Sequence, residues 1–223
     1  MIKQYLYIMK LTFLRMSLNR IFQQIYSKKK TMEGKIIEFG AYEGSSKNFT
    51  GFMKIIGKKD IVYADKIIKK NKGIMSEDLE NTLSFHDQSF DNVIIFNVLE
   101  HVFNINNAIK EIHRCLKKDG FIIGSTPFIH RIHNAPSDFN RYSEQFLNKI
   151  LIEKNFTDVS VEVYGFGPFT ASYVMIFDYT KFIPILNNFI LTFCIMVDTF
   201  INIFTKTKLK IIYPITICFS AKK

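Results

Sequence analysis

Two histidines lie just after apolar runs, at the positions where α/β proteins carry reactive groups. His101, with Glu100 before it, follows a short apolar run that ends at Phe96. His133 lies in a long polar segment that comes after a second apolar run. Open α/β sheets bind ligands at the carboxyl ends of their strands, and long loops there tend to carry function. A histidine beside a bound hydroxyl could act as its general base, so His133 is the first candidate for catalysis and His101 the second.

These side chains also have a structural interpretation. Glu100 and His101 could form only the polar start of a helix, since glutamate suits the first helical turn. Asp138 and Arg141, which lie close to His133 in the sequence, could simply pair with one another. Function is favoured for His133 because the segment around it is long, irregular and polar.

A glycine-containing turn and a later aspartate suggest a nucleoside site. Gly40 and Gly44 follow the β-prone run Lys35–Phe39, and glycine lets the backbone turn sharply and approach a ligand closely. A helix is expected after this turn. Asp65 ends the next β-prone run, near the spacing of about 20 residues at which an acid binds ribose hydroxyls. The alternatives are an ordinary turn at the glycines and a surface aspartate that caps a turn.

Short apolar runs alternate with helical patterns along the chain. Between the runs Asn92–Phe96 and Phe121–Gly124, apolar residues recur at spacings of three and four, which predicts a helix with cations at its end and Gly120 beyond it. Strand, helix and strand form a βαβ unit, so both strands should be buried and parallel. Further strands are expected at Ile61–Ala64, Val159–Val163 and Ile211–Ser220, and a helix at Ser143–Asn155 with Ser143 as its cap and Phe146, Leu147, Ile150 and Leu151 as its buried face.

Composition bounds the class of protein. The chain has 223 residues, 48% of them hydrophobic, which suits one domain with a real core and excludes a disordered chain. Its three cysteines lie far apart in apolar surroundings, so we expect no disulfide framework, no metal site and a cytoplasmic location. The formal charge of +10 suits nucleic acid, anionic lipid or an acidic substrate, or reflects only a lysine-rich composition.

The first 30 residues fall outside the alternating pattern. They mix apolar with basic residues and lack the apolar core and cleavage site of a signal peptide. One or two helices are expected here, docked on the sheet or in contact with a membrane. Residues 1–30 are therefore interpreted as a helical extension, and residues 31–223 as the main domain with an insert at 166–210.

The insert contains an amphipathic helix. Between Asn187 and Thr205, helical positions separate into a polar side and a broad apolar side, and only Leu191 and Ile195 break the separation. Asp198 makes this a poor transmembrane span. The helix should cover its own domain or a partner, or lie peripherally in an anionic membrane interface, which would be the inner face of the cytoplasmic membrane. Basic residues follow it, namely Lys206, Lys208 and Lys210.

The stretch from Thr82 to Phe128 resembles the class I S-adenosylmethionine-dependent methyltransferases, of the type 11-like kind. The likeness lies in Leu83-Ser84-Phe85, Ser89-Phe90-Asp91, Val98-Leu99-Glu100-His101-Val102 and Glu111-Ile112-His113-Arg114-Cys115-Leu116-Lys117, in the family's order and spacing. The next segment is similar to the acceptor loop of a subset of these enzymes, several of which act in cell-surface glycan or lipid pathways. Its matching residues are Pro127, Phe128, His133, Pro136, Asp138, Arg141 and Tyr142.

The resemblance implies a Rossmann-like α/β fold with a seven-stranded, mostly parallel sheet whose last strand is antiparallel. It also implies transfer of a methyl group from S-adenosylmethionine to a small-molecule, glycan or lipid-linked acceptor. Two other functions stay open. Tyr42 replaces the middle glycine of the family's loop, which suits an inactive binding or scaffold protein. The positive charge suits a nucleic-acid methyltransferase, although the chain has no Asn-Pro-Pro-aromatic motif and nucleic acid is the less favoured partner.

The resemblance also implies the site residues. Glu38 would meet the cationic amino-acid end of the cofactor, and Asp78, or else Glu77, would lie beside the adenine amino group. The implied cofactor-binding residues are Glu38, Gly40, Ala41, Gly44, Asp65, Asp78, Leu79, Asn97 and Val98. The implied acceptor-binding residues are His133, Asp138, Arg141 and Tyr142.

Overall fold

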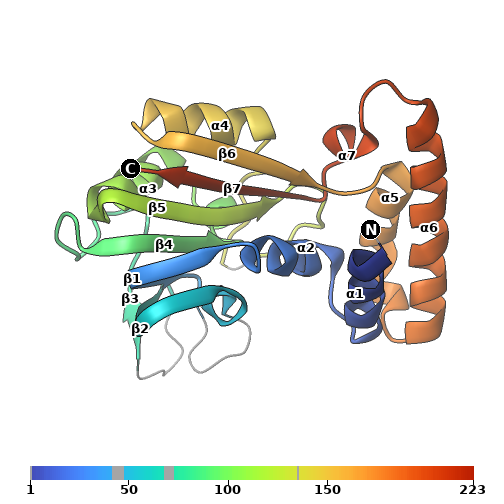
Figure 1. Cartoon of the computed structure of the whole chain (residues 1–223), viewed down its shortest axis with the longest axis horizontal. Coiled ribbons are helices and arrows are strands. Elements are labelled where there is room, and N and C mark those ends of the chain that lie inside the picture. Colours follow the sequence, from blue (N-terminus) through green and yellow to red (C-terminus); the bar gives the residue numbers. More distant parts are fainter. Residues whose placement is uncertain (1, 42–47, 68–72, 135) are drawn as a thin grey trace. The chain divides into compact units, whose positions relative to one another are not determined.

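The structure, a computed structural model, describes residues 2–41, 48–67, 73–134 and 136–223 (Figure 1). Its elements, in chain order, are α1 (Ile2–Phe13), α2 (Leu18–Ser27), β1 (Thr31–Phe39), the 3-10 helix η1 (Phe49–Phe52), β2 (Lys54–Asp65), β3 (Ile74–Ser76), β4 (Phe90–Phe96), the 3-10 helix η2 (Leu99–His101), α3 (Ile105–Cys115), β5 (Leu116–Pro127), α4 (Glu144–Glu153), β6 (Thr157–Tyr164), α5 (Pro168–Thr180), α6 (Pro184–Phe204), α7 (Leu209–Ile212) and β7 (Thr216–Lys222).

One sheet holds seven strands in the order β3-β2-β1-β4-β5-β7-β6. The five strands from β3 to β5 pair in parallel. Strand β7 is antiparallel to β5, because the N–H of Asp119 donates to the carbonyl of Lys223 and that of Phe128 to Ile215. The arrowhead of β7 in Figure 1 accordingly points opposite to those of β5 and β6. The expected fold is confirmed.

The central strand β4 is apolar from Val93 to Phe96. Val93, Ile94 and Ile95 of β4 are all fully buried. Side chains on both faces of a parallel strand are covered, so such strands read as continuous apolar runs rather than as alternation. This is why the run at β4 was recognisable in the sequence.

Several boundaries differ from the predicted ones. Helix α3 ends at Cys115, and the lysine run belongs to β5, where Asp119 has a φ of 64°. Strand β7 begins at Thr216 rather than at Ile211, because residues 209–212 form α7. After Gly40, the described residues hold only the short η1 in place of the expected helix.

Helix α4 has the predicted cap and almost the predicted buried face. The Ser143 hydroxyl accepts the N–H of Phe146 at 3.2 Å. Leu147, Ile150 and Leu151 are buried, as expected. Phe146 itself is exposed and stacks on the ring of Tyr142, with ring centroids 4.9 Å apart, so its place in the buried face was predicted wrongly.

The chain divides into two compact units. The first comprises residues 24–126, 133–162 and 218–223, and it holds most of the sheet. The second comprises residues 1–23, 127–132 and 163–217, with helices α1, α5, α6 and α7. The division into an extension over 1–30 and a domain over 31–223 stays a prediction.

Helix α6 turns its polar side inward within the helical unit. The carboxylate of Asp198 is buried and accepts the N–H groups of Phe169 and Thr170 at 3.0 and 2.8 Å, which caps α5. On the same side, the amide oxygen of Asn188 accepts a hydrogen bond from the hydroxyl group of Thr12 in α1, at 2.8 Å. The buried residues of α6 are Asn187, Leu191, Cys194, Ile195 and Asp198.

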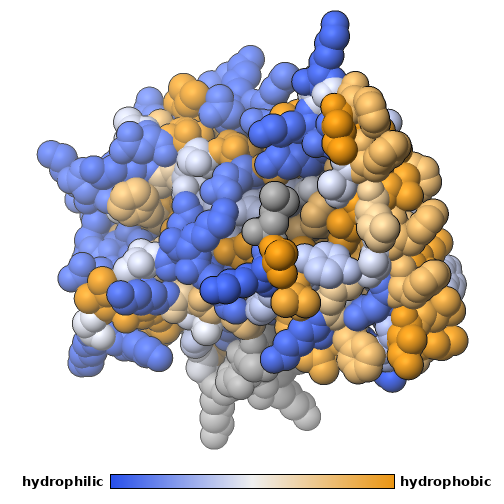
Figure 2. All heavy atoms as spheres, turned by 45° about the vertical axis from the view of Figure 1, so that its right-hand side comes forward, coloured by the Kyte–Doolittle hydropathy of each residue, from blue (hydrophilic) through white to orange (hydrophobic). Residues whose placement is uncertain are grey.

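The apolar side of α6 consequently faces outward. Phe193 is 56% exposed and Phe200 63% exposed. Figure 2 shows apolar side chains, in orange, gathered along this helix. Within the described residues, α6 is the one helix long and apolar enough to cross a membrane, judged by length and composition.

Candidate active site

The carboxyl ends of β1, β2 and β4 meet at one edge of the sheet. Phe39 is paired with Ala64 of β2 and with Ile95 of β4. The residues that follow these positions, Gly40 and Asp65 among them, therefore lie at the same edge. The strand order reverses between β1 and β4, and such a reversal is where open α/β sheets bind ligands.

The turns after β1 and β4 pack directly against each other. Gly40 has a φ of 70°, and a Cβ added to it would lie 2.4 Å from Cγ2 of Val98. Asn97 also adopts a positive φ, of 55°, and its N–H donates to the carbonyl of Ser125 at 3.0 Å. Ala41, next to the glycine, is buried. Only glycine fits at position 40, because both the backbone conformation and the space exclude a side chain.

Glu38 of β1 binds the backbone at the start of η1. Its carboxylate is buried and accepts the N–H groups of Phe49 and Thr50 at 2.6 and 3.0 Å. The Phe49 ring stacks on Phe96, with centroids 4.1 Å apart. Tyr42 and Gly44 lie outside the described residues, at 42–47. The contact of Glu38 with a cofactor stays a prediction.

Asp65 lies half-buried at the end of β2. Its Oδ1 accepts the N–H of Ile67 at 2.8 Å, which is the turn-capping role that the sequence left open. Among the described residues, Oδ2 has no hydrogen-bond partner. Capping thus uses one carboxylate oxygen, and the other is available to a ligand at the edge of the sheet.

Asp78 and Leu79 follow β3, at the same end of the sheet. Asp78 accepts the N–H of Glu80 at 3.0 Å and pairs with the ammonium group of Lys66 at 3.0 Å. This hydrogen bond from Lys66 to Asp78 raises the pKa of the lysine. Leu79 is buried. The fallback candidate, Glu77, bonds instead to the N–H and the hydroxyl of Ser84, which is a structural role.

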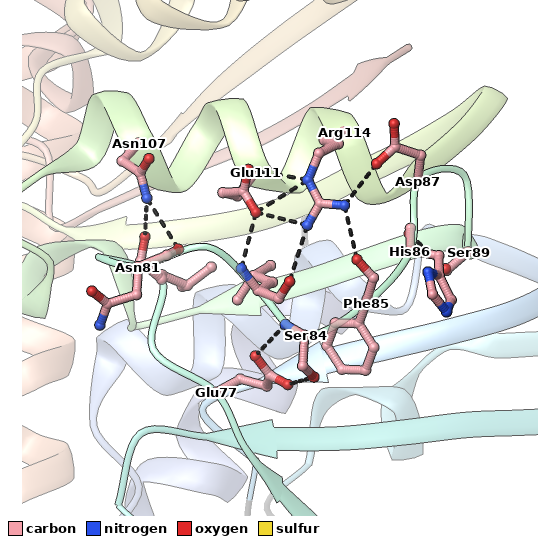
Figure 3. Close-up of polar contacts among 12 residues, drawn as sticks. Glu77, Asn81, Ser84, Phe85, His86, Asp87, Ser89, Asn107, Glu111 and Arg114 are labelled. Carbon is pink, nitrogen blue, oxygen red and sulfur yellow. Dashed lines mark hydrogen bonds and ion pairs between the residues drawn. The ribbon is translucent and has the colours of Figure 1, made fainter.

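Arg114 of α3 fixes residues 83–87, which follow these residues in the chain (Figure 3). Its guanidinium group donates to Glu111 at 2.7 Å, to Asp87 at 2.8 Å and to the carbonyl oxygens of Phe85 and Leu83 at 2.8 and 3.1 Å. Glu111 is buried and accepts the N–H of Leu83 at 2.9 Å. The two separate sequence motifs around Leu83 and Arg114 therefore meet in one network, a contact that sequence reasoning missed.

Replacing Arg114 with alanine should lower the free energy of unfolding by about 3 kcal/mol, since it leaves the buried Glu111 without its cation. Urea denaturation would measure the change. The control is Lys149→Ala on α4, whose ion pair with Glu153 is exposed and should contribute about 1 kcal/mol or less. Equal losses in the two variants would show that Arg114 does not hold this segment.

Glu100, His101 and His133 form a second cluster at the same edge. Glu100 and His101 lie on η2, just after β4, and His133 follows β5. The rings of His101 and His133 lie 4.9 Å apart, so the structure brings the two predicted catalytic residues together. Glu100 is fully buried, and its two carboxyl oxygens have no hydrogen-bond partner in the described parts of the chain. Burial raises the pKa of Glu100 to about 8.

The polar segment after β5 is tied to this cluster. The carboxylate of Asp138 accepts the N–H of His133 at 2.9 Å and pairs with Arg141 at 2.7 Å. The hydrogen bond from Arg141 holds the pKa of Asp138 well below its usual range. Asp138 and Arg141 thus make the pair that the structural interpretation anticipated. Tyr142 is buried, and its hydroxyl has no partner among the residues described. Acceptor binding by these residues stays a prediction.

Comparisons with known proteins agree with this fold. Residues 57–124 match a family model described as a methyltransferase domain. The chain is similar to an S-adenosylmethionine-dependent methyltransferase from Archaeoglobus fulgidus, with 14% identity, a TM-score of 0.56, and coverage of 96% of this chain and 94% of that one. No curated protein sequence matches the chain.

Two further solved structures show how widely the fold is used. Phosphoethanolamine N-methyltransferase 2 of Haemonchus contortus, solved with S-adenosyl-L-methionine, is 14% identical with a TM-score of 0.53, and the match covers 91% of this chain and 52% of that one. The cyclase SpnF is 12% identical with a TM-score of 0.55, over 94% of this chain and 83% of that one. The sheet order, the antiparallel strand β7 and these likenesses together give the chain the class I methyltransferase fold, with a methyltransferase domain matched over residues 57–124.

Proposed function

We propose that this protein transfers a methyl group from S-adenosylmethionine to a small-molecule, glycan or lipid-linked acceptor. The observation that carries the proposal is the shared edge of β1, β2 and β4. There Gly40 follows β1 at the strand-order reversal, and Asp65 ends the neighbouring strand β2. Methyl transfer is an in-line displacement at the sulfonium methyl, and holding the two reactants in line supplies most of the rate.

The cofactor suits the residues at this edge. Gly40 lets the backbone come close to a ligand, and Asp65 keeps an acceptor oxygen for the ribose hydroxyls. Asp78 and the buried Leu79 are the residues expected beside the adenine, and Asn107 of α3 donates to the carbonyl oxygen of Leu79 at 3.2 Å. The N-methyltransferase from Haemonchus contortus, which has a similar fold, was solved with this cofactor.

The acceptor is expected beside the histidines. A base near its hydroxyl would add about 10²- to 10⁴-fold to the rate. His133 is the first candidate because its side chain is partly exposed, at 29%, whereas that of His101 is 11% exposed. In addition, His101 Nδ1 is bonded to the carbonyl oxygen of Ser137.

Replacing Asp65 with alanine should weaken the binding of S-adenosylmethionine about ten- to a hundred-fold. The loss of one hydrogen bond to a charged group is worth about 1.5–3 kcal/mol. Calorimetry would measure the dissociation constant. Asp60→Ala, an exposed aspartate on the same strand, is the control and should bind like the wild type. An Asp65→Ala variant that is folded and binds with unchanged affinity would remove Asp65 from the site, and a wild type that binds no cofactor would favour the scaffold alternative.

We further propose that the outward face of α6 lies on an anionic membrane surface. A face with exposed phenylalanines normally marks an interface, and here the polar side of the same helix is already used inside the unit. Exposed Lys206, Lys208 and Lys210 follow the helix and favour anionic headgroups, at about 1 kcal/mol each near a charged surface. Binding to a membrane would confine the enzyme and a lipid-linked acceptor to one plane.

The helical unit also has a basic pocket, which is lined by residues outside α6. It has a volume of about 270 Å³, and Arg15, Arg131 and Lys181 are among its lining residues. Asp178, also in the lining, pairs with Arg131 at 2.5 Å and with Lys181 at 2.6 Å. One acid among three cations leaves a net positive pocket, which suits an anionic group.

A further inference from the structure

We propose that Glu100, His101 and His133 form a binding site for a divalent transition-metal ion. One potential ligand atom from each residue lies within 4.8 Å of the other two. Zinc and related ions are bound at about 2.0–2.2 Å from imidazole nitrogen and carboxylate oxygen. Ligand atoms around such an ion lie about 3–4 Å apart, so a small closure of the partly exposed His133 side chain would complete the site.

The burial of Glu100 is the first argument for a cation here. Its side chain is fully buried, and neither carboxyl oxygen has a hydrogen-bond partner in the described ranges. An unpaired carboxylate is costly in such a place, so buried carboxylates are protonated, paired with a cation or bound to a metal. A metal ion would displace the proton from Glu100 and bind its carboxylate. Arg141 is already bound to Asp138 through two nitrogens. Its charge still attracts the carboxylate of Glu100, but without a hydrogen bond. The imidazole of His101 lies close to Glu100, with Nε2 at 3.8 Å from Oε1.

The hydrogen bonds behind the histidines are the second argument. Metal-binding histidines almost always donate the other ring N–H to a carbonyl or carboxylate, which fixes the tautomer and the ring. His101 has this arrangement, since its Nδ1 bonds the carbonyl oxygen of Ser137 and leaves Nε2 toward Glu100. His133 Nδ1 lies 3.6 Å from the carboxylate of Asp138, which is itself held by Arg141.

The types of ligand atom indicate which metal ions this site would bind. Two imidazoles and one carboxylate suit zinc, iron or manganese better than the all-oxygen sites of calcium or magnesium. Three protein ligands also leave coordination positions open, as in catalytic rather than structural zinc sites. An oxygen atom of the acceptor could occupy such a position and lose its proton more readily there, and the ion would then replace His133 as the group that activates the acceptor. That use rests on the proposed methyl transfer, whereas the metal site itself does not.

The test is a titration of the protein, purified without a histidine tag and stripped with a chelator, with Co²⁺ as a spectroscopic probe and with Zn²⁺. We expect one ion per chain by calorimetry, together with the visible absorption of bound Co²⁺. His133→Asn should weaken binding at least about 100-fold, and Asp138→Asn about 10- to 100-fold, the range for a residue that orients a ligand. His86→Asn is the matched control, because His86 is exposed and outside the cluster, and it should bind like the wild type.

Circular dichroism and thermal melting would establish that each variant is folded. Glu100→Gln keeps the size of the buried side chain and removes its negative charge, so a folded Glu100→Gln protein should also lose the ion. Two results would overturn the proposal. One is a wild type that binds neither ion at one per chain, and the other is a folded His133→Asn variant that binds as tightly as His86→Asn. Because these readouts involve no methyl transfer, they can fail while the proposed function stands.

Discussion

Replacing Phe193 and Phe200 with aspartate should abolish the binding of this protein to anionic vesicles. Both rings project from α6 and are more than half exposed. Burying a phenylalanine is worth about 1.5–3 kcal/mol, so losing two should weaken vesicle binding more than about 100-fold. The two added carboxylates would also be repelled by the anionic surface. Co-sedimentation with vesicles at low salt would measure the change.

The matched control is a double variant on exposed phenylalanines away from α6. Phe103 and Phe139 are both exposed, with ring centroids 5.5 Å apart, and Phe103→Asp with Phe139→Asp should leave vesicle binding intact. A wild-type protein that stays in the supernatant at low salt would refute the membrane proposal. Release by salt or by alkaline carbonate would identify peripheral binding, and resistance to both would instead favour a helix that crosses the bilayer.

The inverted orientation of α6 shows what sequence periodicity can and cannot give. Placing successive residues at 100° steps around a helix separated a polar side from an apolar side of α6. This step needs only the geometry of a helix. It did not reveal which side faces inward. Leu191 and Ile195, the two residues that broke the pattern, are the leucine and isoleucine of α6 that are buried. They lie among Asn187 and Asp198, whose burial is offset by hydrogen bonds with α5 and its C-terminal turn.

The sheet was predictable for a different reason. The central strand β4 is covered on both faces, so it appears as a continuous apolar run from Val93 to Phe96, and the connecting helix α3 has a regular apolar face. Strand β2 is mostly exposed, and only its end showed a β-prone run. Boundaries were harder, since α3 passes directly into β5 at Cys115 without the glycine that usually ends a helix. The Asp119-Gly120 pair, read as a helix stop, lies inside the strand.

The candidate site was predictable where it depends on topology alone. His101 and His133 follow neighbouring parallel strands, and the carboxyl ends of such strands meet, so their proximity follows from the strand order. The complete burial of Glu100 does not follow from the sequence, because it depends on the segment after β5, whose Phe139 N–H donates to the carbonyl of Glu100 at 2.9 Å. The proposed metal site was not predicted either, because its three ligands would come from two segments that are distant in the sequence.

Replacing Gly40 with alanine should destabilise the protein and remove cofactor binding. The alanine would have to adopt a φ of 70°, which costs an L-residue about 1–2 kcal/mol. Its Cβ would also lie 2.4 Å from Cγ2 of Val98, and overpacking of this kind costs about 1–3 kcal/mol. We therefore expect a loss of about 2–5 kcal/mol in the free energy of unfolding, measured by urea denaturation.

The two costs can be separated by a second substitution. Val98→Ala removes the methyl group that the new Cβ would meet, so in the double variant with Gly40→Ala the packing cost should disappear while the backbone cost remains. The double variant should therefore be about 1–3 kcal/mol more stable than the sum of the two single effects would give. Gly51→Ala is the control, because a Cβ there would meet nothing within 4 Å, and such a surface change should stay within about 0.5 kcal/mol. If Gly40→Ala unfolds at the same urea concentration as Gly51→Ala, the turns after β1 and β4 are not in close contact. If Val98→Ala alone still binds S-adenosylmethionine, and the double variant regains stability but does not bind it, Gly40 acts on the cofactor through the backbone conformation that only glycine adopts easily.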